Sequence, residues 1–116
     1  MRMWNVPPHL MCRQHLLGEH LEMHMFAGAI KRKMSLWGYI NRGLVDTALI
    51  KSRHDELVIE LQQRGYNHES PLNVPDVPTE GKIDVIENLQ VLSKRCNECA
   101  RRIQESNYAG KDQSTG

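Results

Sequence analysis

One long helical pattern near the start of the chain restricts the fold more than any other feature of the sequence. From about His9 to Lys33, apolar residues recur at the three- and four-residue steps of an α-helix. The preceding "NVPP" at 5–8 is expected to be extended, because proline disfavours helix in the residue before it. One side of the predicted helix carries Leu10, Leu17, Leu21 and Gly28, and this side is widened by Leu16, Met23, Ala27 and Ile30.

Two further helices are predicted downstream. The first covers roughly residues 47–64, with Asp46 as its N-cap and Gly65 as the left-handed residue that ends it. The second covers roughly 83–105, where apolar residues again recur at helical spacing. Segments 35–44 and 66–82 contain glycines and prolines and are expected to be irregular connections.

No segment shows the alternation of a strand, so the predicted fold class is all-α. The 116 residues fit one domain, and the low aromatic content of 5% permits only a modest core. We therefore predict a compact three-helix single domain over residues 1–105, with long irregular connections and a polar tail at 106–116. A substrate is expected to bind such a domain across its surface or in a shallow groove.

The charges are unevenly distributed along the chain. Residues 1–53 contain eight Lys and Arg against three Asp and Glu, whereas residues 54–116 contain seven against eleven. This polarity indicates a basic face suited to phosphates, although an uneven solvated surface is a common alternative. No apolar run approaches the roughly 18 residues that a membrane span needs.

Three cysteines, Cys12, Cys96 and Cys99, occur without a signal peptide, so reduced thiols in a cytoplasmic protein are expected. The pair "CNEC" at 96–99 is a single Cys-x-x-Cys, whereas a structural zinc site needs two more ligands, which Cys12 or His24 could supply. The alternative is that both cysteines pack as small apolar side chains on the third helix. His20 and His24 are four residues apart but lack the His-Glu-x-x-His order of zinc hydrolases. We expect no metal and no cofactor.

A second side of the first predicted helix is polar. It carries His15, Gly18, Glu19, Glu22, Phe26 and Ala29. Gly18 costs the helix about 1 kcal/mol relative to alanine. Either a ligand or another backbone approaches closely there, or two helices pack tightly at this point.

The chain resembles the phage-type pyrimidine-dimer DNA glycosylases, the endonuclease V of ultraviolet repair. The resemblance rests on two stretches, "RQHLLGEHLEMHMFAGAIKR" (13–32) and "SRHDELVIELQQRGYN" (52–67), and on the three-helix plan. The resemblance covers residues 1–67 well and the third helix weakly. It implies that the α-amine of the mature chain attacks the sugar C1′ of a damaged pyrimidine nucleotide. An imine forms, and β-elimination then breaks the strand. The implied enzyme is a bifunctional DNA glycosylase and AP lyase that binds damaged double-stranded DNA as a monomer.

Carried over residue by residue, the resemblance makes Glu22 the carboxylate beside the amine and places His15 and Gln14 near the sugar–phosphate. Initiator methionine is normally retained before a residue as large as Arg2, so Met1 would supply the amine. An α-amine loses its proton nearer to neutral pH than a lysine does, which favours it as the nucleophile. Leu21 and Met25 stand where the family prototype has arginines, so other residues must contact the DNA. The expected DNA-binding residues are Arg2, Arg13, Gln14, His15, Gly18, Lys31, Arg32, Lys33, Arg42, Arg53 and His54.

Two alternatives remain open from the sequence. The chain could be a non-catalytic helical module that binds DNA or a metal. It could also be a glycosylase for a different modified base, because the aromatic C-terminal segment of the prototype is missing here.

Overall fold

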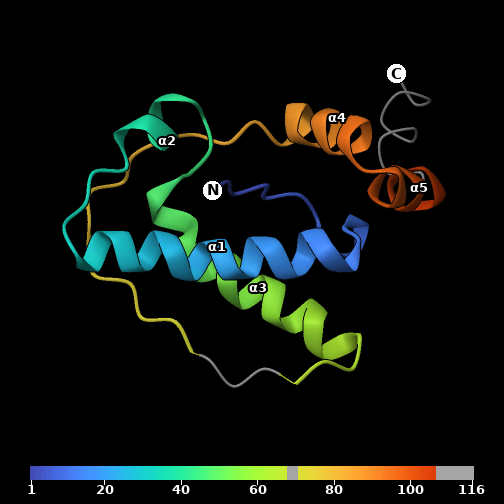
Figure 1. Cartoon of the computed structure of the whole chain (residues 1–116), viewed down its shortest axis with the longest axis horizontal. Coiled ribbons are helices and arrows are strands. Elements are labelled where there is room, and N and C mark those ends of the chain that lie inside the picture. The colour runs from blue at the N-terminus through green and yellow to red at the C-terminus, as the bar shows by residue number, and fades with distance from the viewer. Residues whose placement is uncertain (68–70, 107–116) are drawn as a thin grey trace.

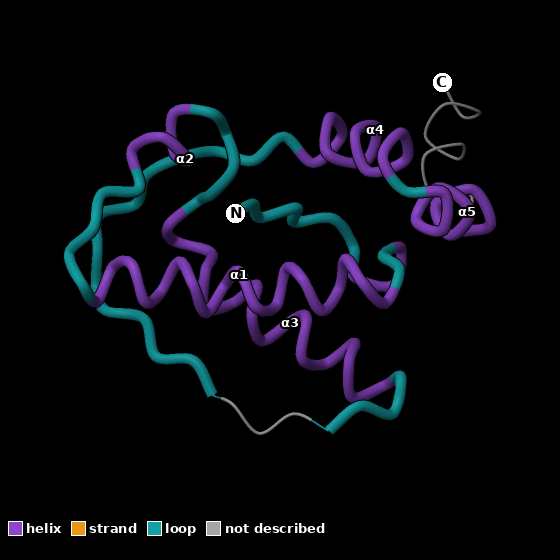
Figure 2. Tube along the Cα trace, viewed as in Figure 1, coloured by secondary structure: helices purple, strands orange, loops and turns teal. Residues whose placement is uncertain are grey.

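The structure is a computed structural model that describes residues 1–67 and 71–106. The all-α class is confirmed, since these residues form helices and no strand (Figures 1 and 2). Of the tail predicted at 106–116, only Ser106 is described, as the last residue of a helix; positions 107–116 lie outside the described residues. The elements are η1 (Pro8–Leu10), α1 (Arg13–Lys31), α2 (Trp37–Asn41), η2 (Thr47–Leu49), α3 (Ile50–Gln63), α4 (Val85–Arg95) and α5 (Asn97–Ser106).

Helix α1 packs against α3, and together they form the centre of the molecule (Figure 1). The predicted apolar side of α1 is confirmed in part: Leu16, Met23 and Ala27 are buried, whereas Leu21 is 59% exposed. The prediction was wrong for Leu21 and for the second, polar side, where Glu19 and Phe26 are buried, because α1 is covered over a wide arc, by α3 and by the N-terminal segment. The Leu17–Leu21 stripe lies at the margin of that arc, so apolar spacing alone did not define the buried side.

The second predicted helix is confirmed together with both of its end signals. The Asp46 carboxylate accepts a hydrogen bond from the Ala48 backbone at 3.0 Å and begins η2, which continues into α3. Gly65 follows the end of α3 with φ +92°, a conformation that favours glycine. Ile50, Leu57 and Leu61 form the buried side of α3.

The third predicted helix is divided in two. Cys96 adopts an extended conformation (φ −136°, ψ 115°) that ends α4, and α5 begins at the next residue. Neither glycine nor proline marks the break, and the apolar spacing continues across it, so no local signal indicates that the helix ends here. The segment predicted as the first connection contains the short helix α2.

The first six residues lie within the fold rather than on its outside, and the extended conformation expected for 5–8 is interrupted at Asn5, which has φ +54°, and at Pro8, which begins η1. Met3 and Val6 are fully buried, and the Met3 N–H donates to the Leu44 carbonyl at 2.7 Å. In Figure 1 this segment runs beside α1 and between α1 and α4. The chain end is therefore held between α1, α4 and the segment that contains Leu44.

A long strap, residues 71–84, returns from the end of α3 to the start of α4 (Figure 2). Thr47 fastens it: its hydroxyl donates to the Pro78 carbonyl at 2.8 Å, and the Thr47 and Glu80 backbone and side-chain groups exchange further hydrogen bonds. Gly81 has φ +91°, and a Cβ added there would lie 2.1 Å from the Val45 carbonyl oxygen. None of the helices in the described ranges has the length and apolar character required to cross a bilayer.

Candidate active site at the chain terminus

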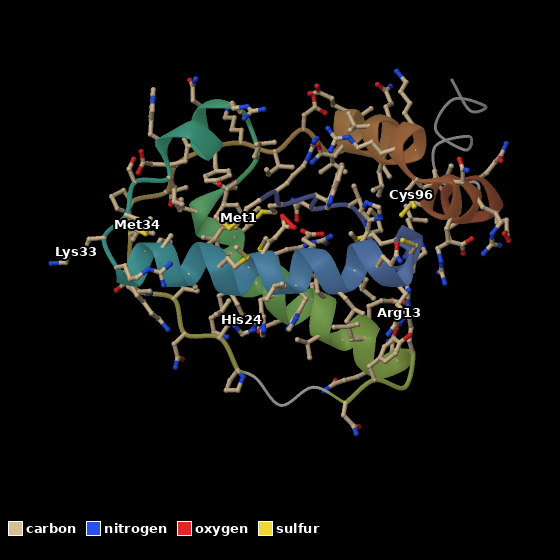
Figure 3. The ribbon with its side chains drawn as sticks, viewed as in Figure 1. Met1, Arg13, His24, Lys33, Met34 and Cys96 are labelled. Carbon is tan, nitrogen blue, oxygen red and sulfur yellow. The ribbon has the colours of Figure 1, made fainter. Side chains whose placement is uncertain are left out.

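The carboxylate of Glu22 lies against the start of the chain. The backbone N–H of Arg2 donates to Glu22 Oε1 at 2.5 Å. The covalent geometry of the backbone holds the Met1 α-amine within about 4 Å of that nitrogen. Figure 3 shows Met1 over the middle of α1, where Glu22 is located. The structure thus brings together Met1 and Glu22, two residues that the sequence analysis had paired.

A second glutamate, Glu19, anchors the segment that carries Met1. Its Oε2 accepts hydrogen bonds from the backbone of Trp4 at 3.0 Å and of Asn5 at 3.4 Å. The same carboxylate is bound by Arg53, whose Nε and Nη2 reach its two oxygens at 2.7 and 2.8 Å. Glu19 is 1% exposed, so this bidentate pair lies inside the fold. The sequence placed Glu19 on the correct side of the helix but gave no sign of this anchoring.

The placement of Arg53 corrects one predicted role. Its side chain is only 1% exposed and is taken up by Glu19 and Glu56, so it cannot reach a DNA phosphate. Burial acts to lower the pKa of Arg53, but hydrogen bonds and charge from both carboxylates outweigh it and raise the pKa. His54 is corrected for the same reason: it is buried, with Nε2 3.1 Å from His24 Nε2 and Nδ1 2.9 Å from Asp55.

Arg2 and Asn88 close the other side of the N-terminal segment. Asn88, buried on α4, accepts from Arg2 Nη2 at 2.6 Å and donates to the Trp4 carbonyl at 2.7 Å. The Arg2 guanidinium stacks 4.1 Å from the centre of the Trp4 ring, and Arg95 approaches the same ring at 5.9 Å. Burial, followed by the nearby Arg95 charge, lowers the pKa of Arg2. Neither Asn88 nor Arg95 carried a recognisable signal in the sequence.

A hollow of about 330 Å³ opens beside Met1. It is lined by Met1, His24, Met25, Gly28, Ala29, Arg32 and Met34. Gly18 lies one turn before Glu22, and a Cβ added there would meet nothing within 4 Å. The tight helix packing considered for Gly18 is therefore absent, and the space beside it is open.

The remaining predicted DNA-binding residues differ in position. Five cations and one amide are exposed, namely Arg13, Gln14, Lys31, Arg32, Lys33 and Arg42. Arg13 and Lys33 lie at opposite ends of α1 (Figure 3), so the exposed cations of this helix are divided between its two ends rather than meeting at one point. His15 is half-buried, and its Nδ1 is turned toward the sulfur atoms of Cys12 and Cys99 at 3.3 and 3.7 Å.

Comparison with known proteins places the chain in a family. The sequence model of a family described as pyrimidine dimer DNA glycosylase matches residues 1–74, well over half of the chain. The chain belongs to the pyrimidine dimer DNA glycosylase family. Membership in this glycosylase family implies a DNA repair enzyme that acts on damaged DNA. No curated protein and no solved structure matches the chain. Helices α4 and α5 lie beyond the matched residues, so Asn88 belongs to a part of this glycosylase that the family model does not cover.

Proposed function

We propose that this glycosylase is also an AP lyase, and that the α-amine of Met1 is its nucleophile. The observation that supports this most directly is the hydrogen bond from the Arg2 backbone to Glu22, because it fixes the chain end next to a carboxylate. Glu19 and Asn88 hold residues 2–5 on either side, which limits the positions that the amine can take.

The proposed reaction has two stages. The uncharged Met1 amine bonds to the sugar C1′, the glycosidic bond breaks, and the damaged pyrimidine leaves with the bonding electron pair. The amine loses a proton and the sugar ring opens, which gives an imine between Met1 and C1′. Loss of a C2′ proton then expels the 3′ phosphate, and water releases the enzyme. The Glu22 carboxylate is placed to stabilise positive charge at the sugar and to exchange protons there.

The space around Met1 can accommodate a DNA duplex that is kinked and has an extruded nucleotide. The open space beside Gly18 and the hollow next to Met1 leave room for a sugar and its backbone. Leu21, Met25 and Met34 are large apolar side chains that stay exposed around this region, and apolar side chains commonly insert where a protein kinks DNA. Extrusion of a nucleotide costs a few kcal/mol, and contacts from Arg13, Lys31 and Arg32 to phosphates can offset that cost.

Borohydride trapping on a duplex with one abasic site tests the proposal. We expect a covalent adduct, and peptide mass spectrometry should place the added sugar on the Met1 amine. Selective acetylation of the α-amine should abolish the adduct. A variant with Lys31→Ala and Lys33→Ala is the matched control: it removes two nearby side-chain amines and, although it should bind DNA more weakly, it should still be trapped when the protein is in large excess.

An adduct that forms normally after acetylation, or that maps to a lysine, would contradict the role of Met1. Failure to trap any adduct would instead favour the non-catalytic DNA-binding alternative. Ultraviolet-irradiated and uracil-containing duplexes run in parallel would identify the lesion: we expect strand scission on the irradiated duplex and none on the uracil duplex.

A further inference from the structure

Four potential metal ligands meet where the start of α1 touches α5. Each of Cys12, His15, Cys96 and Cys99 offers one ligand atom, and all four atoms lie within 4.8 Å of one another. Cys12 and Cys99 are buried, while His15 and Cys96 are partly buried. Figure 3 shows the Cys96 sulfur at the junction of α4 and α5, facing the start of α1.

The four residues form two equivalent pairs. Cys12 is the N-cap of α1 and His15 is three residues later; Cys96 directly precedes α5 and Cys99 is three residues later. In each pair a backbone N–H donates to a sulfur: His15 N to Cys12 Sγ at 3.4 Å, and Cys99 N to Cys96 Sγ at 3.4 Å. A third such bond, from Cys12 N to Cys99 Sγ at 3.2 Å, links the pairs. These backbone donors fix the positions of the sulfur atoms, and a bound metal would itself deprotonate the thiols that coordinate it.

Three of the six separations between the ligand atoms are close to those of a tetrahedral metal site, and the others are no longer than 4.8 Å. Zinc bonds of about 2.3 Å to sulfur and about 2.0–2.1 Å to nitrogen place sulfur atoms about 3.8 Å apart and sulfur and nitrogen about 3.6 Å apart in a tetrahedron. Cys96 Sγ lies 3.8 Å from Cys12 Sγ, and His15 Nδ1 lies 3.3 and 3.7 Å from the sulfurs of Cys12 and Cys99. From this geometry we propose that Cys12, His15, Cys96 and Cys99 bind one structural zinc ion.

The alternatives explain the cluster less well. A disulfide would need its sulfur atoms about 2.05 Å apart, and all three cysteines are unbonded. Packing of cysteines as small apolar side chains would not account for an imidazole nitrogen turned toward two of them. Three thiolates and one imidazole in a closed tetrahedral set are typical of zinc, and four protein ligands leave no position for a substrate.

The ion would hold the C-terminal helices onto the rest of the glycosylase. Helix α5 contacts η1 and α4, and it buries little apolar surface beyond Cys99 and Ile103. Helix α4 carries Asn88, which holds Arg2 and Trp4 of the N-terminal segment. A metal that joins α5 to α1 would therefore also stabilise the position of Met1, although it would take no part in the reaction.

Metal content and thiol protection test the site on the full chain. We expect about one zinc per chain by elemental analysis after purification without added chelator. Bound zinc should protect all three cysteines from alkylation, and removal with a strong chelator should expose them and lower the Tm by about 10 °C or more. Cobalt in place of zinc should give thiolate-to-metal charge-transfer absorption, which weakens as each cysteine is replaced.

The cluster of His20, His24 and His54 is the other group whose ligand atoms lie close enough to hold a metal within the described chain, so it provides the matched control. Cys96→Ser combined with Cys99→Ser should lose the metal, whereas His20→Asn combined with His24→Asn should keep it. Retention by the cysteine variant together with loss by the histidine variant would overturn the proposal. If the cysteine variant does not fold, the unmodified chain still tests the proposal. The proposal would also be overturned if this chain bound no zinc after reconstitution and its thiols were alkylated equally with and without zinc.

Discussion

Glu19 and Glu22 are the same residue type, one turn apart on the same helix, yet their surroundings differ sharply. Glu19 is buried and uses both oxygens, binding Arg53 and two backbone N–H groups. Glu22 is only partly buried, and its hydrogen bond goes to the Arg2 backbone beside the chain end. A carboxylate whose oxygens are fully occupied by fixed partners holds the segment in position, whereas a carboxylate that can accept further hydrogen bonds can stabilise a charge that forms during a reaction.

The largest expected effect comes from Glu22→Gln. This change keeps the shape and removes the charge, so the rate of base release should fall by about 10²- to 10⁴-fold. The Tm should stay within a degree or so, because the side chain has no buried charged partner. Single-turnover kinetics on a dimer-containing duplex and thermal unfolding measure the two quantities. A variant that keeps its rate would remove Glu22 from the proposed chemistry.

Glu19→Gln, in contrast, should act mainly on the stability of the fold. It leaves the buried Arg53 guanidinium without its main counter-charge, which costs about 3–5 kcal/mol in the free energy of unfolding. Denaturant unfolding measures that loss. Combining it with Arg53→Met should recover much of the stability, because the unpaired buried charge is then gone. Equal stability of the single variant and the unmodified chain would show that Glu19 is not the anchor described above.

Asn88→Ala tests the far side of the N-terminal segment. The buried Trp4 carbonyl loses its donor, and we expect a cost of about 1–3 kcal/mol in unfolding free energy. The rate should fall too, because residues 2–4 become less restricted. Gln90→Ala, an exposed position on the same helix, is the control and should change neither quantity. A rate loss without any loss of stability would point to direct contact of Asn88 with DNA.

Gly18→Ala has the smallest expected effect on stability and separates folding from substrate access. Because nothing lies within 4 Å of the added methyl group, the helix should gain about 0.5–1 kcal/mol. If the DNA backbone occupies this space, the affinity for a damaged duplex should nevertheless fall several-fold. Gly38→Ala in α2 also has an open Cβ position and should leave affinity unchanged. Unchanged affinity in Gly18→Ala would place the DNA elsewhere.

Features with a local cause could be predicted from the sequence. Asp46 and Gly65 mark the ends of their helix through their own side chain and backbone preferences. The proximity of Glu22 to Met1 followed from the family resemblance rather than from spacing alone. The roles of Glu19, Arg53 and Asn88 could not be predicted, because each depends on a partner at least fifteen positions away.

The break in the third predicted helix also could not be predicted from the sequence. Nothing around Cys96 favours an extended residue locally, so the apolar spacing predicted one continuous helix. The break turns Cys96 and Cys99 toward Cys12, a residue 84 positions earlier than Cys96. Such a grouping becomes visible only when the tertiary contacts are known.

Hydrogen bonds between Thr47 and both Pro78 and Glu80 hold the strap against the start of α3. Any side chain at Gly81 would collide with the Val45 backbone and displace the strap from Thr47. The displacement would shift the start of α4, and α4 carries Asn88, which holds Arg2. A substitution at this loop glycine is therefore expected to lower repair activity from a position outside the proposed active site.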